Sequence, residues 1–124
     1  MERRDVEAWV ERYVAAWRTP GTELLTTLFT EDATYAPSPW STPLVGLARL
    51  AEFWEAERDS AGEQFEIASE VVAVDGSTGV VRVAVDYAAG HRWRDLWLVQ
   101  LDSDSRCYVF EEWPFAPEQP DGHG

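Results

Sequence analysis

The chain has 124 residues, which is the size of one domain, and 45% of them are hydrophobic, which suffices for one buried core. Its formal net charge of −13 repels nucleic-acid phosphates and anionic membrane surfaces, and its ten basic residues, all arginines, are scattered. The chain has one cysteine, no apolar run of about 18 residues and no apolar leader at its start, so we expect a soluble cytoplasmic protein without a disulfide.

Three helices are predicted in the first half of the chain. The first has apolar residues at the spacing of one helix face and ends before Pro20 and Gly21. A short second helix is predicted over residues 22–29, and a third over residues 47–58. The stripe of the first helix consists of Val6, Trp9, Val10, Tyr13, Val14 and Trp17.

Strands dominate the second half of the chain. A short strand is predicted earlier, at residues 33–36, and is followed by a proline-rich loop at residues 37–43 that carries Trp40. After a break at residues 60–62 come four β-rich runs joined by short turns, which predicts consecutive antiparallel hairpins. These runs are residues 64–74, 79–88, 91–102 and 106–115.

Helices followed by a meander of long strands predict an α+β domain with its helices packed on one face of a curved, mainly antiparallel sheet. No internal repeat or linker divides the chain, so residues 1–116 are predicted to form a single domain. Residues 117–124 are rich in proline, glycine and polar residues and are predicted to be a loose tail.

The order of these elements resembles the nuclear-transport-factor-2-like superfamily. Several stretches are similar to its ketosteroid-isomerase-like and SnoaL-like polyketide-cyclase branches, and together they extend over nearly the whole chain. They are ERYVAAW (residues 11–17), LFTEDATY (28–35), GLARLAEFW (46–54), WRDLW (93–97) and FEEW (110–113). The resemblance implies a cone in which three helices and the sheet enclose one pocket. It also implies homodimers that pair through the open face of the sheet.

Three residues are candidates for catalysis. Tyr13 lies on the apolar stripe, and by the resemblance it takes the place of the tyrosine that hydrogen-bonds the developing oxyanion in ketosteroid isomerases. Asp95 alternates with Trp93 and Trp97 on one face of a strand, where a carboxylate must be paired, hydrated or protonated. By the resemblance it matches the acid that stays protonated. Glu112 lies near the place of an acid found in SnoaL-like members.

Each candidate also has a plainer interpretation. Tyr13 is otherwise a core tyrosine with a satisfied hydroxyl. Asp95 is otherwise paired with an arginine or turned towards a dimer partner. Glu112 has apolar residues on both faces of its strand and is otherwise an exposed carboxylate. His91, at a hairpin edge, and His123, in the tail, are expected to be solvated.

Seven tryptophans, five phenylalanines and four tyrosines exceed what a small core needs, which indicates a lined cavity or an interface. Trp40 is the strongest candidate for ligand contact, because a loop tryptophan has no core to fill. The predicted ligand-contacting residues are Trp17, Tyr35, Trp40, Phe53, Trp54, Trp93, Trp97 and Phe110. We expect no cofactor, and no spacing of ligand residues predicts a metal site.

One departure from the ketosteroid-isomerase pattern bears on activity. Those enzymes carry a catalytic Asp just after the first strand, and here that place falls at or beside Pro37 with no carboxylate near. The resemblance therefore implies a pocket for a small, mostly apolar molecule bearing a carbonyl or hydroxyl, with an isomerase, cyclase or hydrolase activity that lacks the usual base. The alternative is a non-catalytic ligand-binding domain or a homodimeric interaction domain.

Overall fold

Helix α1 (Arg3–Arg18) packs its predicted apolar stripe against the sheet. The computed structural model describes residues 1–58 and 64–120. The backbone N–H of Glu2 donates to the Asp5 carboxylate at 2.7 Å and satisfies a group at the start of the helix. At the other end Thr19 Oγ1 donates to the carbonyl of Ala15 at 2.7 Å, and Pro20 prevents the helix from continuing.

The predicted second helix is wrong in length. Helix α2 (Leu25–Leu28) is a single turn, and Phe29 already belongs to strand β1 (Phe29–Ala36), which begins four residues before the predicted strand. The reason is tertiary, because Phe29 pairs with Cys107 of the last strand at the other end of the chain. A two-residue strand β2 (Leu44–Val45), which was not predicted, pairs antiparallel with β1.

Helix α3 (Leu47–Glu57) follows Gly46, whose φ of 92° favours glycine. Leu50 and Trp54 form its buried face, and Arg58, just beyond it, donates to the carbonyl of Ala16 and so ties the ends of α3 and α1 together. The helices therefore do not form a uniform set of three at the N-terminus. One is long, one is a single turn, and the third follows the first two strands.

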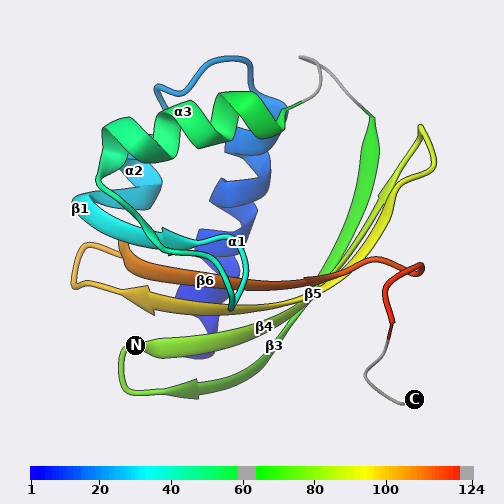
Figure 1. Ribbon diagram of the computed structural model, residues 1–124. Helices are drawn as coiled ribbons and strands as arrows, with labels where there is room; N and C mark the ends of the chain where they lie inside the picture. The colour runs from blue at the N-terminus through cyan, green and yellow to red at the C-terminus, as the bar shows by residue number, and fades with distance from the viewer. Residues whose placement is uncertain (59–63, 121–124) are drawn as a thin grey trace.

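The four long strands lie within one residue of their predicted bounds at every end and pair antiparallel with their neighbours in sequence, as predicted. They are β3 (Phe65–Asp75), β4 (Thr78–Tyr87), β5 (Arg92–Leu101) and β6 (Cys107–Phe115). The six-stranded sheet has the order β2-β1-β6-β5-β4-β3, and only β1 and β6 run parallel. It curves beneath the helices, which all lie on one side of it (Figure 1).

Two predictions fall partly outside this description. The break at residues 60–62 and residues 121–124 of the tail, His123 included, lie outside the described residues. Residues 117–120 contain no helix or strand. None of the helices in residues 1–58 and 64–120 combines the length and the apolar character needed to cross a bilayer.

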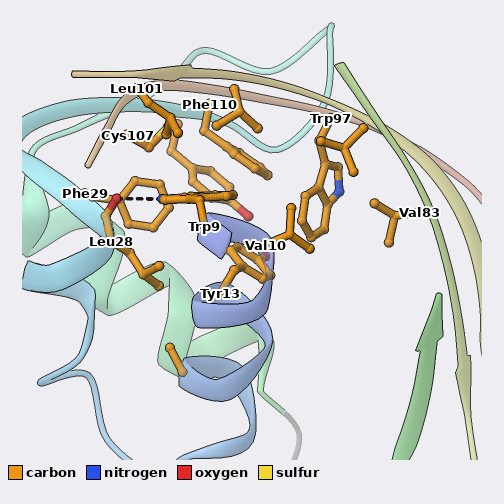
Figure 2. Close-up of a cluster of buried hydrophobic side chains, with 14 of the residues drawn as sticks. Trp9, Val10, Tyr13, Leu28, Phe29, Val83, Trp97, Leu101, Cys107 and Phe110 are labelled. Carbon is orange, nitrogen blue, oxygen red and sulfur yellow. Dashed lines mark hydrogen bonds between the residues drawn. The ribbon is translucent and has the colours of Figure 1, made fainter. Parts of the chain in front are cut away.

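The hydrophobic core lies between α1 and the sheet. Phe110 of β6 is 1% exposed and contacts five aromatic rings, among them Tyr35 at 4.7 Å and Trp97 at 5.3 Å between ring centroids. Trp9 is fully buried, and its indole Nε1 donates to the carbonyl of Leu28 at 2.9 Å, the dashed line in Figure 2. The core therefore fills one end of the space under the helices with aromatic rings.

Helix α1 approaches the sheet closely in its first turn, at Val6. A Cβ added to Gly79 of β4 would lie 2.9 Å from a methyl group of Val6, so this position has room only for glycine. Along β5 the inward residues change from Val99 and Leu101 in the core to Trp97, Asp95 and Trp93, which line a cavity. The core and the cavity thus occupy opposite ends of the same sheet face.

Candidate functional site

A cavity of about 530 Å³ opens beneath the last turns of α1, against the ends of β3, β4 and β5 that lie away from the core. This volume is within the range of small-molecule sites, roughly 300–1,000 Å³. Its aromatic lining consists of Tyr13, Trp17, Tyr35, Phe53, Phe65, Tyr87, Trp93 and Trp97. The other lining residues are Val14, Pro37, Glu57, Ile67, Val85, His91, Asp95, Glu112 and Pro114.

Asp95 projects from β5 into this cavity. The alternation of a β-strand places Asp95 on the inward face with Trp93 and Trp97, as predicted. The residue is buried, with only 7% of its surface exposed. The indole Nε1 of Trp97 donates to Asp95 Oδ2 at 3.3 Å, whereas Asp95 Oδ1 is buried with no hydrogen-bond donor among the described residues.

Glu112 meets Asp95 from the neighbouring strand. On β6 it stands opposite Trp97, and its carboxyl group is within hydrogen-bonding reach of that of Asp95. Two ionised carboxylates cannot hydrogen-bond, because both are acceptors only. A hydrogen bond between the two groups therefore requires that one of them carries a proton.

The electrostatics favour this arrangement. Burial raises the pKa of Glu112 well above its ordinary value, and the hydrogen bond and the charge of Asp95 raise it further. Burial also raises the pKa of Asp95, while donation from Glu112 and from Trp97 opposes that rise. Both shifts favour a pair that shares one proton, and the hydrogen bond and charge of Asp95, which raise the pKa of Glu112, favour Glu112 as the group that carries it.

Two tyrosines extend this cluster. The hydroxyl of Tyr35, on β1, donates to Glu112 Oε1 at 3.4 Å and is also hydrogen-bonded to the hydroxyl of Tyr13, on α1. This hydrogen bond lowers the pKa of Tyr13 and raises that of Tyr35, so Tyr35 is the donor and its single proton is given either to Tyr13 or to Glu112. Burial raises the pKa of both tyrosines well above 10, so both remain neutral hydrogen-bond donors.

The structure brings the three predicted catalytic residues together, since Tyr13, Asp95 and Glu112 all line the cavity. It also gives Glu112, whose direction the sequence left open, an inward side chain. The plainer interpretation of Asp95 as the partner of an arginine does not hold, because Arg92 and Arg94 both pair with Asp86.

The predicted ligand-contacting residues divide into two groups. Five of them line the cavity, and the other three do not. Trp54 and Phe110 are 1% exposed and belong to the core. Trp40, the strongest candidate, does not line the cavity, because its side chain is 95% exposed to solvent, and its contact with a ligand stays a prediction. The five that line the cavity are Trp17, Tyr35, Phe53, Trp93 and Trp97.

Several lining residues were missed from the sequence. Glu57 stands one helical turn after Phe53, so the spacing of α3 could have indicated it. Tyr87 shares the inward face of β4 with Val85, which alternation could have indicated. His91 also lines the cavity, where we expected a solvated histidine; its side chain is exposed at the rim.

Pro37 follows β1 directly and lines the cavity. The place at which the resemblance puts the ketosteroid-isomerase base is therefore at the cavity but offers no carboxyl group. Within residues 1–58 and 64–120, no three His, Cys, Asp or Glu side chains form a group that could hold a metal ion. Cys107 is fully buried, and burial raises the pKa of its thiol to about 12.

The sequence model of the SnoaL-like domain matches residues 10–102. The chain belongs to the SnoaL-like domain family. No curated protein matches the sequence.

Solved structures show the same fold. A SnoaL-like family member from Agrobacterium tumefaciens has a TM-score of 0.72 and 19% identity, over 90% of this chain and 98% of the other. A ketosteroid isomerase-like protein from Erwinia carotovora atroseptica has a TM-score of 0.68 and 19% identity, over 94% and 98%. An NTF-2 like protein of unknown function from Silicibacter pomeroyi has a TM-score of 0.63 and 24% identity, over 90% and 94%.

Proposed function

We propose that this SnoaL-like domain binds a small, mostly apolar molecule in its cavity and moves a proton on that molecule with the Asp95–Glu112 pair. The observation that carries the proposal is the contact between these two carboxyl groups at the wall of a cavity that is otherwise lined mainly by aromatic rings. The reaction would be an isomerisation, cyclisation or hydrolysis that starts from proton transfer.

The pair supplies an acid and a base side by side. Asp95, ionised, accepts a proton from a C–H or O–H group of the substrate, while Glu112 donates its proton to a substrate oxygen. The Tyr13 hydroxyl is a neutral donor that stabilises negative charge on that oxygen, while Tyr35 donates its own proton within the cluster. These roles explain how proton transfer proceeds although Pro37 stands in the place of the usual base.

Hydrogen–deuterium exchange tests proton transfer without knowledge of the natural substrate. A panel of ring ketones is incubated with the protein in D2O, and mass spectrometry measures deuterium at the carbon next to the carbonyl. We expect protein-dependent exchange for at least one ketone, lowered about 100-fold by Asp95→Asn.

Glu111→Gln is the matched control, because Glu111 is on the same strand as Glu112 but on the outer face, where Trp113 Nε1 donates to it at 2.6 Å. It should exchange as the wild type does. Saturable binding of ketones with no exchange would favour the non-catalytic alternative, and exchange that survives Asp95→Asn would exclude Asp95 as the base.

We propose in addition that the domain pairs with a second copy through the outer face of the sheet. Leu96 and Phe115 are 41% and 52% exposed there, and Leu96 stands opposite Trp113, which is 39% exposed. Large exposed apolar side chains on adjacent strands are typical of interfaces. Sedimentation velocity should give a dimer that Leu96→Glu converts to a monomer, and a wild-type monomer at all concentrations would refute the proposal.

A further inference from the structure

The charges that face the cavity have one sign. Glu57, Asp95 and Glu112 line it, and among the described lining residues there is no arginine; the whole chain contains no lysine. His91, at the rim, is the one lining residue that can become positive. A carboxylate or phosphate on a ligand would therefore enter a negative, poorly hydrated site without a counter-charge.

The arginines nearest the cavity are occupied elsewhere. Arg18 stacks over the Phe65 ring at 4.4 Å and donates to the carbonyl of Phe65 at 3.2 Å. Arg58 donates to the carbonyls of Ala16 and Gly21 and to Glu55. The Arg58 guanidinium also lies 5.6 Å from the centroid of the Trp17 ring. Both guanidinium groups are therefore engaged with backbone carbonyls and with the rings of Phe65 and Trp17.

The aromatic walls add attraction for positive charge. The π-faces of Trp, Tyr and Phe attract cations, most strongly at Trp, and Trp93 and Trp97 line this cavity, whereas the Trp17 ring already has Arg58 over it. Aromatic rings around a site with nearby carboxylates form the kind of environment that binds quaternary ammonium groups. The same rings offer a carboxylate no compensation.

An independent observation concerns Asp95. Its Oδ1 atom is buried, has no hydrogen-bond donor among the described residues, and belongs to a side chain that lines the cavity. A buried carboxylate oxygen without a donor is costly. An ammonium group in the cavity would supply the missing charge and hydrogen bond.

We propose that the cavity selects an organic cation, a small amine or quaternary ammonium compound with an apolar body, whose positive charge lies between the aromatic rings and the Asp95–Glu112 pair. This inference rests on the ligand site proposed above and is independent of the reaction proposed for it. The expected order of affinity is cationic ligands first, neutral ligands second and anionic ligands last.

The proposal has a definite pH signature. A bound cation favours the fully ionised pair, so it displaces the proton that Glu112 carries, and affinity rises with pH by up to about tenfold per pH unit. A neutral ligand that accepts a hydrogen bond from protonated Glu112 shows the opposite slope. The other titratable groups that face the pair are Tyr13 on α1, Tyr35 on β1, Glu57 on α3, Tyr87 on β4 and His91 before β5.

Three probes of similar shape test the charge preference in the wild-type protein. They are benzyltrimethylammonium, benzyl methyl ketone and phenylacetate, which are cationic, neutral and anionic and do not themselves titrate near neutral pH. Calorimetry at several pH values, in buffer that contains salt to screen the net charge of the protein, gives each dissociation constant. We expect the cation to bind at least about tenfold more tightly than the ketone, and phenylacetate most weakly.

A pair of double variants separates the cavity from the overall charge. Asp95→Asn/Glu112→Gln removes the charge and proton of the pair with little change in shape, and it should weaken the cation about tenfold and leave the ketone within about twofold. Glu70→Gln/Glu111→Gln neutralises two acids of the outer face and should leave all three affinities unchanged.

Other results would overturn the inference. If the ketone binds as tightly as the cation and its affinity falls with rising pH, the cavity is a site for neutral acceptors, and the proposed acid–base function stands without the cation. If phenylacetate binds most tightly, the charge argument is wrong. If none of the three probes binds saturably, both the inference and the proposed ligand site fail, whatever the behaviour of the variants.

Discussion

The raised pKa of Glu112 predicts how the free energy of unfolding depends on pH. Glu112→Gln replaces the protonated carboxyl by an amide that donates to Asp95 at every pH. In the wild type the folded protein keeps a proton that a Glu in the unfolded chain loses above about pH 4.3, because burial and Asp95 raise the pKa of Glu112. The free energy of unfolding should therefore fall as pH rises from that value to the folded-state pKa.

The size of the effect follows from the number of protons. One extra proton in the folded state gives a slope of at most about 1.4 kcal/mol per pH unit, so two pH units within the window cost about 3 kcal/mol. The raised pKa of Asp95 acts in the same direction. Against a total stability of roughly 5–15 kcal/mol for a domain, this is a large part.

Urea unfolding followed by circular dichroism between about pH 5 and about pH 8 measures the slope. We expect Glu112→Gln to flatten the curve and to be more stable than the wild type at the upper end. Electrostatic repulsion within a chain of net charge −13 also grows with pH. Glu111→Gln is the control for this repulsion, because the substitution removes one charge outside the cavity. Equal slopes in the wild type and both variants would show that Glu112 carries no proton in the folded protein.

Five further substitutions test three separate parts of the structure. Asp95→Asn should change ligand binding or proton exchange far more than stability; a variant that unfolds, with unchanged affinity in the folded fraction, would make Asp95 structural. Phe110→Ala should lose about 3–5 kcal/mol of unfolding free energy, whereas Trp40→Ala, at a side chain 95% exposed, should change it by less than about 0.5 kcal/mol in the same urea titration. Gly79→Ala should destabilise by about 1–3 kcal/mol because its Cβ would meet Val6 at 2.9 Å, and Val6→Ala should reduce that loss in a double-mutant cycle; additive losses would place the clash elsewhere.

Local periodicity was enough to predict most of the elements and the inward face of β5. The stripe of α1 and the alternation of Trp93, Asp95 and Trp97 are properties of neighbouring residues, and each element keeps them wherever it packs. The same locality explains the errors. Phe29 was assigned to a helix because its pairing with Cys107 joins positions far apart in the chain, and no local pattern contains that contact.

The sequence by itself determined an α+β domain with one acid among inward tryptophans, because the composition and the helix and strand periodicity of the side chains are local properties of the chain. Only the tertiary structure decided that Glu112 turns inward beside Asp95, that Tyr13 and Tyr35 reach the same pair, and that Trp40 does not. The physical reason is that these four side chains come from α1, β1, β5 and β6, and their contacts exist only once the sheet order brings those elements together.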